Sequence, residues 1–221
     1  MPKLVILSFA AALSASVACS ERVSAATAPT RVADVLKIVA LGDSLTSGYG
    51  IARSEAYPSL LEQLLREARL PFVVVNHGVS GDTTAGGVRR LRAALDERPQ
   101  ILIVALGAND GLRGTPVPAV RRNLEEIIET ALARGVSVLL CGMDALPLYG
   151  WQYTVDFHHM FPSMAEKYGV PLVPFLLNGV FGNEAMLQRD MIHPNASGAR
   201  VIAANIWSYL RPLASALVEA Q

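Results

Sequence analysis

The chain has 221 residues, of which 52% are hydrophobic, and its formal net charge is zero because 19 Lys and Arg balance 19 Asp and Glu. A single hydrophobic core can grow to this size, so one main domain is expected. The balanced charge provides no basic field to neutralise a phosphate backbone, which argues against a nucleic acid as partner.

The first residues have the composition of a secretory signal. Lys3 precedes an apolar run, and small residues follow that run, which is the order found in signal peptides. A transmembrane anchor is the alternative, but a span needs about 20 predominantly apolar residues and this run is shorter. We therefore expect residues 1–26 to be a signal peptide and leader, no stable transmembrane segment after processing, and a periplasmic or secreted bacterial protein.

The sequence contains only two cysteines, Cys19 and Cys141, so it indicates no disulfide framework. Cys19 stands where a bacterial lipoprotein would carry its lipidated cysteine, although residues 16–18 lack the usual leucine. A lipid anchor at Cys19 is thus an open alternative to cleavage alone. Cys141 ends the apolar run "VSVLLC" and is expected to be a buried small hydrophobe, not a reactive thiol.

After the leader, apolar runs alternate with amphipathic stretches. The runs typical of strands cover residues 35–41, 72–76, 101–106, 136–141 and 170–173. The helical patterns lie near residues 54–69, 83–97, 117–134, 151–168 and 196–218. Several apolar runs are continuous, as expected for strands covered on both faces. This alternation predicts an α/β domain over residues 35–221, with a parallel sheet between two layers of helices.

Glycine-rich polar segments follow the first three expected strands: "GDSLTSG", "HGVSGDTTAGG" and "GANDGLRG". The carboxyl ends of parallel strands share one edge of a sheet, and ligands bind outside that edge. The same residue types also make ordinary turns. The segments therefore favour a site at this edge without identifying its chemistry.

Ser44 allows two interpretations. Either Asp43 or Ser44 is only the N-cap of the next helix, or Ser44 is a nucleophile at the junction of a strand and a helix. Near the C-terminus, "QRDMIHPNASG" supplies Asp190 and His193. Pro194 biases His193 away from helical geometry, so this acid and this imidazole are expected on a loop, where both can face one site.

These residues satisfy the needs of an acyl-transferring serine. A hydroxyl nucleophile needs a base, the base needs an orienting acid, and the oxyanion needs fixed donors. Ser44 would attack, His193 would accept its proton, and Asp190 would orient the imidazole. The candidate oxyanion donors are the backbone N–H groups of Ser44 and Gly81 and the side-chain amide of Asn109.

The four blocks that carry these residues resemble, in order, those of the SGNH (GDSL) hydrolase family. They are Gly-Asp-Ser-Leu at 42–45, Gly81 in "GVSGDT", Gly-x-Asn-Asp at 107–110 and Asp-x-x-His-Pro at 190–194. Within the family, "LGDSLTSGYG", "YPSLL" and "GANDGLRG" are most similar to the thioesterase I/lysophospholipase L1 and arylesterase branch. The usual "GGND" is "GAND" here.

The resemblance implies a three-layer α/β/α, flavodoxin-like fold with a mostly parallel five-stranded sheet. It also implies a serine hydrolase of small acyl esters, thioesters or lysophospholipids. No cofactor is expected, because Gly48-Tyr49-Gly50 is no dinucleotide fingerprint, and no metal is expected. Its catalytic residues would be Ser44, Asp190 and His193, and its oxyanion hole would comprise Ser44, Gly81 and Asn109.

Three other functions compete with this one. An α/β-hydrolase is disfavoured because no G-x-S-x-G elbow occurs and because the acid and base lie side by side. A carbohydrate O-deacetylase of the same family is an alternative, although the apolar segments at 111–118 and 143–154 favour an acyl chain over a sugar. A binding module without catalytic activity belongs to a different class of function.

The other polar residues near the motifs are expected to have structural roles. Asp43 would cap or brace the turn at Ser44, and Asp110 and His77 would be hydrogen-bonded within the fold. His158 and His159 could be imagined as metal ligands with Asp156. Adjacent histidines on a helix point in different directions, however, and metal pairs prefer i, i+4 spacing, so a metal site is disfavoured.

Overall fold

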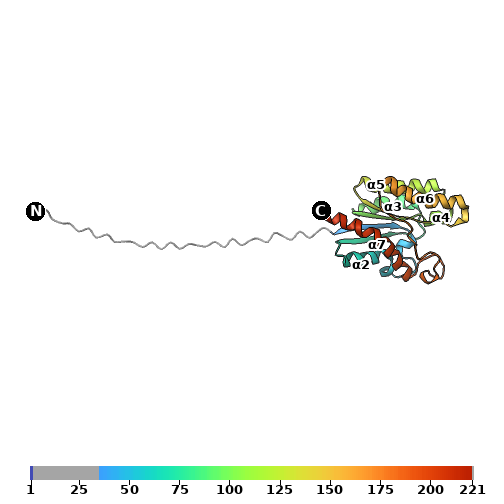
Figure 1. Ribbon diagram of the computed structural model, residues 1–221, viewed down its shortest axis with the longest axis horizontal. Coiled ribbons are helices and arrows are strands. Elements are labelled where there is room, and N and C mark those ends of the chain that lie inside the picture. The colour runs from blue at the N-terminus through green and yellow to red at the C-terminus, as the bar shows by residue number, and fades with distance from the viewer. Residues whose placement is uncertain (2–34, 221) are drawn as a thin grey trace. The chain divides into compact units, whose positions relative to one another are not determined.

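The computed structural model describes residues 35–220 together with Met1, so the expected signal peptide and Cys19 lie outside the described residues. Its centre is a five-stranded sheet with the order β2-β1-β3-β4-β5, in which every pair of neighbours is parallel (Figure 1). The strands are β1 (Leu36–Gly42), β2 (Phe72–Gly78), β3 (Ile101–Ala105), β4 (Ser137–Cys141) and β5 (Leu172–Val173). The predicted α/β fold with a parallel five-stranded sheet is confirmed.

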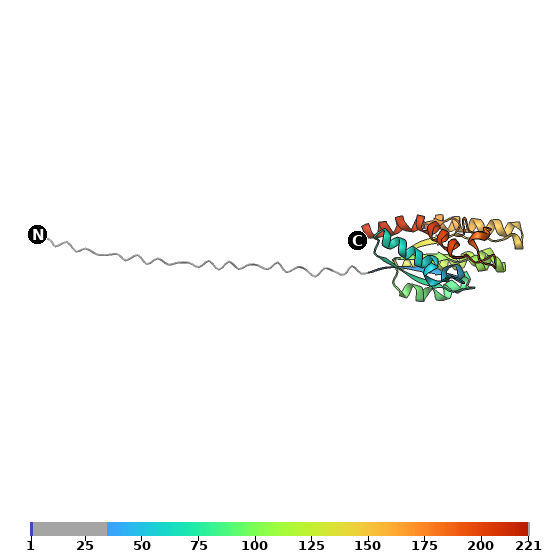
Figure 2. The same cartoon turned by 90° about the horizontal axis from the view of Figure 1, so that it is seen from below.

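Helices cover both faces of the sheet, which explains the continuous apolar runs. The long helices are α2 (Tyr57–Glu67), α3 (Thr84–Asp96), α5 (Val117–Ala133), α6 (Trp151–Tyr168) and α7 (Ala196–Glu219). Helices α2 and α7 pack together on one face, and α3, α5 and α6 form the layer on the other (Figures 1 and 2). Strand β3 is fully buried between these layers. The result is the three-layer arrangement that the resemblance implies.

Strand β5 is shorter than the expected run at 170–173. The N–H of Val170 bonds to Ala165 O, which closes the C-terminal turn of α6. Pro171 has no N–H to donate, although its carbonyl accepts from Leu140 N. Regular pairing therefore begins only at Leu172.

Five short helical segments lie between the strands and the long helices; one follows Asp43, where the capping interpretation expected a helix, and another overlaps the start of the expected pattern at 54–69. They are α1 (Ser44–Ser47), α4 (Ala108–Arg113) and the 3₁₀ turns η1 (Arg53–Glu55), η2 (Pro147–Tyr149) and η3 (Glu184–Met186). A helix of four to six residues shows too little of the 3.6-residue period to be detected in a sequence. Both α1 and α4 begin immediately after a central strand and place residues of the polar motifs on helical turns.

Among the residues that the structure describes, α7 is the one helix long and apolar enough to cross a membrane. One face of it packs against α2, β4 and β5, and Ile202, Ile206 and Leu210 on α7 are fully or almost fully buried.

Candidate active site

Ser44 is the first residue of α1 and directly follows the N-cap, Asp43. The Asp43 side chain accepts a hydrogen bond from Leu45 N at 3.0 Å, so Asp43 and not Ser44 caps the helix. The Ser44 hydroxyl lies 3.1 Å from Nε2 of His193, which is 149 residues away in the sequence. Ser44 is thus placed at the junction without serving as the cap.

His193 lies between Ser44 and a carboxylate. Its Nδ1 is 2.7 Å from Oδ2 of Asp190, and Oδ1 of Asp190 accepts the backbone N–H groups of His193 and Ile192 at 2.9 and 3.0 Å. These bonds, those from His193 first, lower the pKa of Asp190 to about 2. An ionised carboxylate can only accept, so in the neutral tautomer of the imidazole that this contact selects, Nδ1 carries the proton and the lone pair on Nε2 faces the Ser44 hydroxyl.

The loop that carries this pair is held by contacts that the sequence did not indicate. Gln188 Nε2 donates to Tyr49 O at 2.7 Å and to Pro194 O at 2.9 Å. The Tyr49 ring also lies against the His193 ring, with 4.6 Å between their centroids. The loop is therefore attached to the segment that follows α1, and this attachment keeps His193 beside Ser44.

Asn109 lies in the first turn of α4, whose N-cap is Gly107. Its amide nitrogen donates to Asp82 O at 2.9 Å and to Asp43 Oδ2 at 3.3 Å. These two acceptors fix the orientation of the amide. The N–H that makes the longer bond, to Asp43, is the one that could also donate to a developing oxyanion. Gly107 has a φ of +122°, which favours glycine, whereas Ala108 is helical, so "GAND" fits where the family has "GGND".

Asp43 is the buried centre of this arrangement. Its exposed fraction is 0%, and burial raises the pKa of its carboxyl to about 6 despite the hydrogen bond from Leu45. The carboxyl braces both the turn that carries Ser44 and the amide of Asn109.

Arg90, which the sequence did not single out, ties the strand ends together from α3. Its guanidinium donates to Asp82 Oδ2 at 2.7 Å, to His77 O at 2.8 Å and to Gly42 O at 3.0 Å. The ends of β1 and β2 and the loop at Asp82 are therefore fixed by one side chain. Only the fold reveals this role, because Gly42 lies 48 residues from Arg90.

Gly81 lies on the exposed loop before α3 and has a φ of +78°, a conformation that favours glycine. An added Cβ would meet only Arg113 Nη2, at 3.9 Å, so the backbone angle, not crowding, requires glycine. Arg113 also donates to Gly81 O at 2.9 Å.

The five predicted site residues differ in their relation to the pocket beside Ser44. Its lining includes Ser44, Asn109 and His193, whereas Gly81 and Asp190 lie outside the lining.

The remaining polar residues of the motifs make contacts within the fold. Asp110 accepts from the N–H and the hydroxyl of Thr84 at 2.8 and 2.9 Å, and burial raises its pKa. His158 Nδ1 lies 2.7 Å from Asp144, not Asp156, whose carboxylate instead accepts from Gln152. Burial also raises the pKa of the Cys141 thiol, which leaves it protonated.

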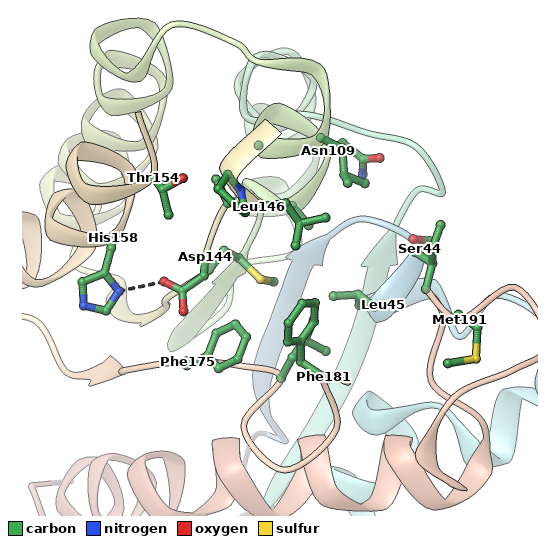
Figure 3. Close-up of a pocket in the computed structure, with 18 of the residues that line it drawn as sticks. Ser44, Leu45, Asn109, Asp144, Leu146, Thr154, His158, Phe175, Phe181 and Met191 are labelled. Carbon is green, nitrogen blue, oxygen red and sulfur yellow. Dashed lines mark hydrogen bonds and ion pairs between the residues drawn. The ribbon is translucent and has the colours of Figure 1, made fainter. Parts of the chain in front are cut away.

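A pocket of about 700 Å³ opens beside Ser44 (Figure 3). Its middle lies between Ser44 at one end and the Asp144–His158 pair at the other and is formed by Leu45, Leu146, Phe175 and Phe181. A volume of this size suits a small-molecule ligand, and the lining is mainly apolar. The apolar segments that follow β3 and β4 contribute to this lining, as the sequence led us to expect.

Comparisons with known proteins identify the family of the chain. Residues 40–201 match the model of the GDSL-like Lipase/Acylhydrolase family. Esterase TesA of Pseudomonas aeruginosa is 37% identical over 83% of this chain and 92% of its own length. Thioesterase 1/protease 1/lysophospholipase L1 of Escherichia coli (strain K12) is 36% identical over 82% of this chain and 85% of its own.

Solved structures show the same likeness. A crystal structure of TesA superposes with a TM-score of 0.77 at 37% identity, covering 80% of this chain and 99% of that one. The chain therefore belongs to the GDSL-like lipase/acylhydrolase family and is an esterase.

Proposed function

We propose that this esterase uses Ser44 as its nucleophile, His193 as its base and Asp190 as its orienting acid, through an acyl-enzyme. One observation carries the proposal: the unbroken series of contacts from Ser44 Oγ to His193 Nε2, at 3.1 Å, and from His193 Nδ1 to Asp190, at 2.7 Å. This is the arrangement that a hydroxyl needs to become nucleophilic.

In the first half of the reaction, Ser44 Oγ forms a bond to the carbonyl carbon while its proton passes to His193 Nε2. The carbonyl oxygen becomes an oxyanion that accepts from the N–H groups of Ser44 and Gly81 and from the amide of Asn109. When the intermediate collapses, the bond to the leaving group breaks and His193 returns the proton to that group. Asp190 stabilises the imidazolium that exists between these steps.

In the second half, water takes the place of the leaving group. The water oxygen attacks the acyl carbon while His193 accepts a proton from the water. The bond between the acyl carbon and Ser44 Oγ then breaks, and His193 returns the proton to Ser44 Oγ. The products are a carboxylic acid and the free enzyme.

The proposed substrates are small acyl esters, thioesters and lysophospholipids. The apolar middle of the pocket suits an acyl chain, and the names of the relatives include esterase, thioesterase and lysophospholipase. A carbohydrate O-deacetylase is the weaker candidate because the middle of the pocket, at Leu45, Leu146 and Phe181, presents apolar side chains to a ligand instead of partners for sugar hydroxyl groups.

We also propose that residues 1–26 direct export and that residues 35–221 form the single hydrolase domain. The composition of the leader supports export to the periplasm or the medium. A lipid on Cys19 would anchor the same domain at a membrane.

A series of p-nitrophenyl esters from acetate to decanoate tests the proposed substrate class. We expect kcat/KM to rise with chain length while the chain fills the apolar middle of the pocket, because each buried CH₂ contributes about 0.8 kcal/mol. Activity confined to acetate would favour the deacetylase. A complete lack of turnover would favour a binding module.

A further inference from the structure

Large apolar side chains are exposed around the mouth of the pocket. Six of them both line the pocket and are more than a third exposed: Leu112, Leu146, Trp151, Phe181, Met191 and Ile192. Leu148 and Tyr149 stand beside Leu146 in η2, with Leu148 65% and Trp151 75% exposed. We call these eight residues the apolar rim.

The apolar rim occupies one end of the molecule. Its residues come from α4, from the segments after β4 and β5, from the first residue of α6, and from the loop that carries His193. All of them surround the pocket at the carboxyl edge of the sheet. Leu132, which is 38% exposed, lies instead at the C-terminal end of α5, the end that leads into the start of β4.

The chemistry of the rim suits an interface between water and hydrocarbon. The stretch 145–155, "ALPLYGWQYTV", contains no charged residue. Tyr149 and Trp151 combine an apolar ring with a polar tip, a combination enriched at membrane interfaces. Tyr149 also donates to Leu112 O at 3.0 Å, which fixes η2 against α4. Exposed apolar patches of this kind mark interaction surfaces.

We propose that the apolar rim docks the enzyme onto aggregates of zwitterionic lysophospholipid, so that an acyl chain passes from the aggregate into the pocket. The inference rests on the proposed function, because the rim is continuous with a pocket that ends at Ser44. An occupant of the rim must then present an acyl ester on a long apolar chain, and such amphiphiles are aggregated in water. The stretch 145–155 is uncharged, and the residues that flank the rim segments carry both signs of charge (Arg113, Asp144, Asp156, Arg189 and Asp190), so the rim lacks the basic cluster that an anionic surface would require.

Binding is measured with lysophosphatidylcholine micelles and the Ser44→Ala variant, which leaves the lipid intact. The chain has two tryptophans, Trp151 and Trp207. We expect a blue shift of the emission that disappears in Ser44→Ala/Trp151→Phe. In the Ser44→Ala variant, a second substitution, Leu148→Ser, should weaken micelle binding about tenfold or more. The matched second substitution Leu132→Ser should leave micelle binding unchanged. Every variant has the same N-terminus, so any contribution of that segment to micelle binding is equal in all of them.

Kinetics separate docking from catalysis in the enzyme with Ser44 intact. With p-nitrophenyl acetate as a monomeric substrate, Leu148→Ser should retain native kcat/KM, which also shows that it is folded. With lysophosphatidylcholine above its micelle concentration, its rate should fall about tenfold.

Other outcomes would overturn the docking proposal in recognisable ways. The absence of a blue shift, or equal losses in Leu148→Ser and Leu132→Ser, would overturn it. Association of the protein with itself in sedimentation, abolished by Leu148→Ser, would show that a second copy covers the rim. Hydrolysis of p-nitrophenyl esters without micelle binding would refute docking and leave the proposed function intact, whereas binding without any hydrolysis would refute the function alone.

Discussion

Ser44 and Asn109 stand at the ends of buried strands, whereas Asp190 and His193 stand on a surface loop. Beneath the first pair, hydrogen bonds join Asp43 to Leu45 and to Asn109, and Asp43 is fully buried. The nucleophile and the amide donor are thus held by the core itself.

The base is held in a different way. Asp190 is exposed, His193 is half-buried, and the contacts of their loop with the rest of the site run through Gln188 and Tyr49. Exposed contacts contribute little to the free energy of unfolding. Substitutions beneath Ser44 should therefore reduce stability and catalysis together, and substitutions in the loop should reduce catalysis alone.

The largest expected effect is that of His193→Ala. Removal of the base should lower kcat by about 10⁶-fold, as loss of a catalytic histidine does in other serine hydrolases. The melting temperature should hardly change, because the loop adds few buried contacts. Turnover of p-nitrophenyl acetate beside a melting curve measures both effects, with His77→Gln as the control that keeps activity. Native turnover in His193→Ala would exclude the proposed base.

Asn109→Ala should have the next largest effect. Loss of an oxyanion donor should lower kcat by about 10² to 10³-fold with little change in KM, equivalent to roughly 2.7–4 kcal/mol. The melting temperature should also fall, because Asp43 and Asp82 O lose a donor.

The matched control for Asn109→Ala is Asn123→Ala. The Asn123 amide donates to Thr84 Oγ1 at 3.0 Å, so its loss should lower the melting temperature without changing kcat. A low melting temperature with native turnover in Asn109→Ala would assign Asn109 the same purely structural role.

Asp43→Asn tests the buried brace through pH. Burial raises the pKa of Asp43 from 3.8 to about 6, so the folded protein binds this proton more tightly than the unfolded chain. This tighter proton binding stabilises the folded state fully below about pH 4, and the stabilisation is lost as the pH rises through 6. The free energy of unfolding should change by about 3 kcal/mol across this range. Urea unfolding between pH 4 and 7 should show this slope in the native protein and a flatter profile in Asp43→Asn. Identical slopes would refute the raised pKa.

The sequence predicted the parts of the molecule that depend on local pattern. The strands and long helices follow from apolar periodicity, and Ser44, Asn109 and His193 from short motifs. A helix after Asp43 was expected from its capping residues, whereas α4 was missed because it is too short to show a period. Gln188, Tyr49 and Arg90 were missed because their partners are distant in the chain: Gln188 and Tyr49 are separated by 139 residues. Only the folded arrangement reveals that they hold the motifs together.

The most direct test is labelling with a fluorophosphonate and mapping of the adduct by mass spectrometry, because such probes react with serines activated by a base. Ser47 and Ser80 lie close by and bond to each other at 3.0 Å, so they serve as internal controls. We expect one adduct, on Ser44, formed much more slowly in His193→Ala and absent from Ser44→Ala. An adduct on Ser47 or Ser80, or labelling that survives Ser44→Ala, would contradict the assignment of Ser44 as the nucleophile.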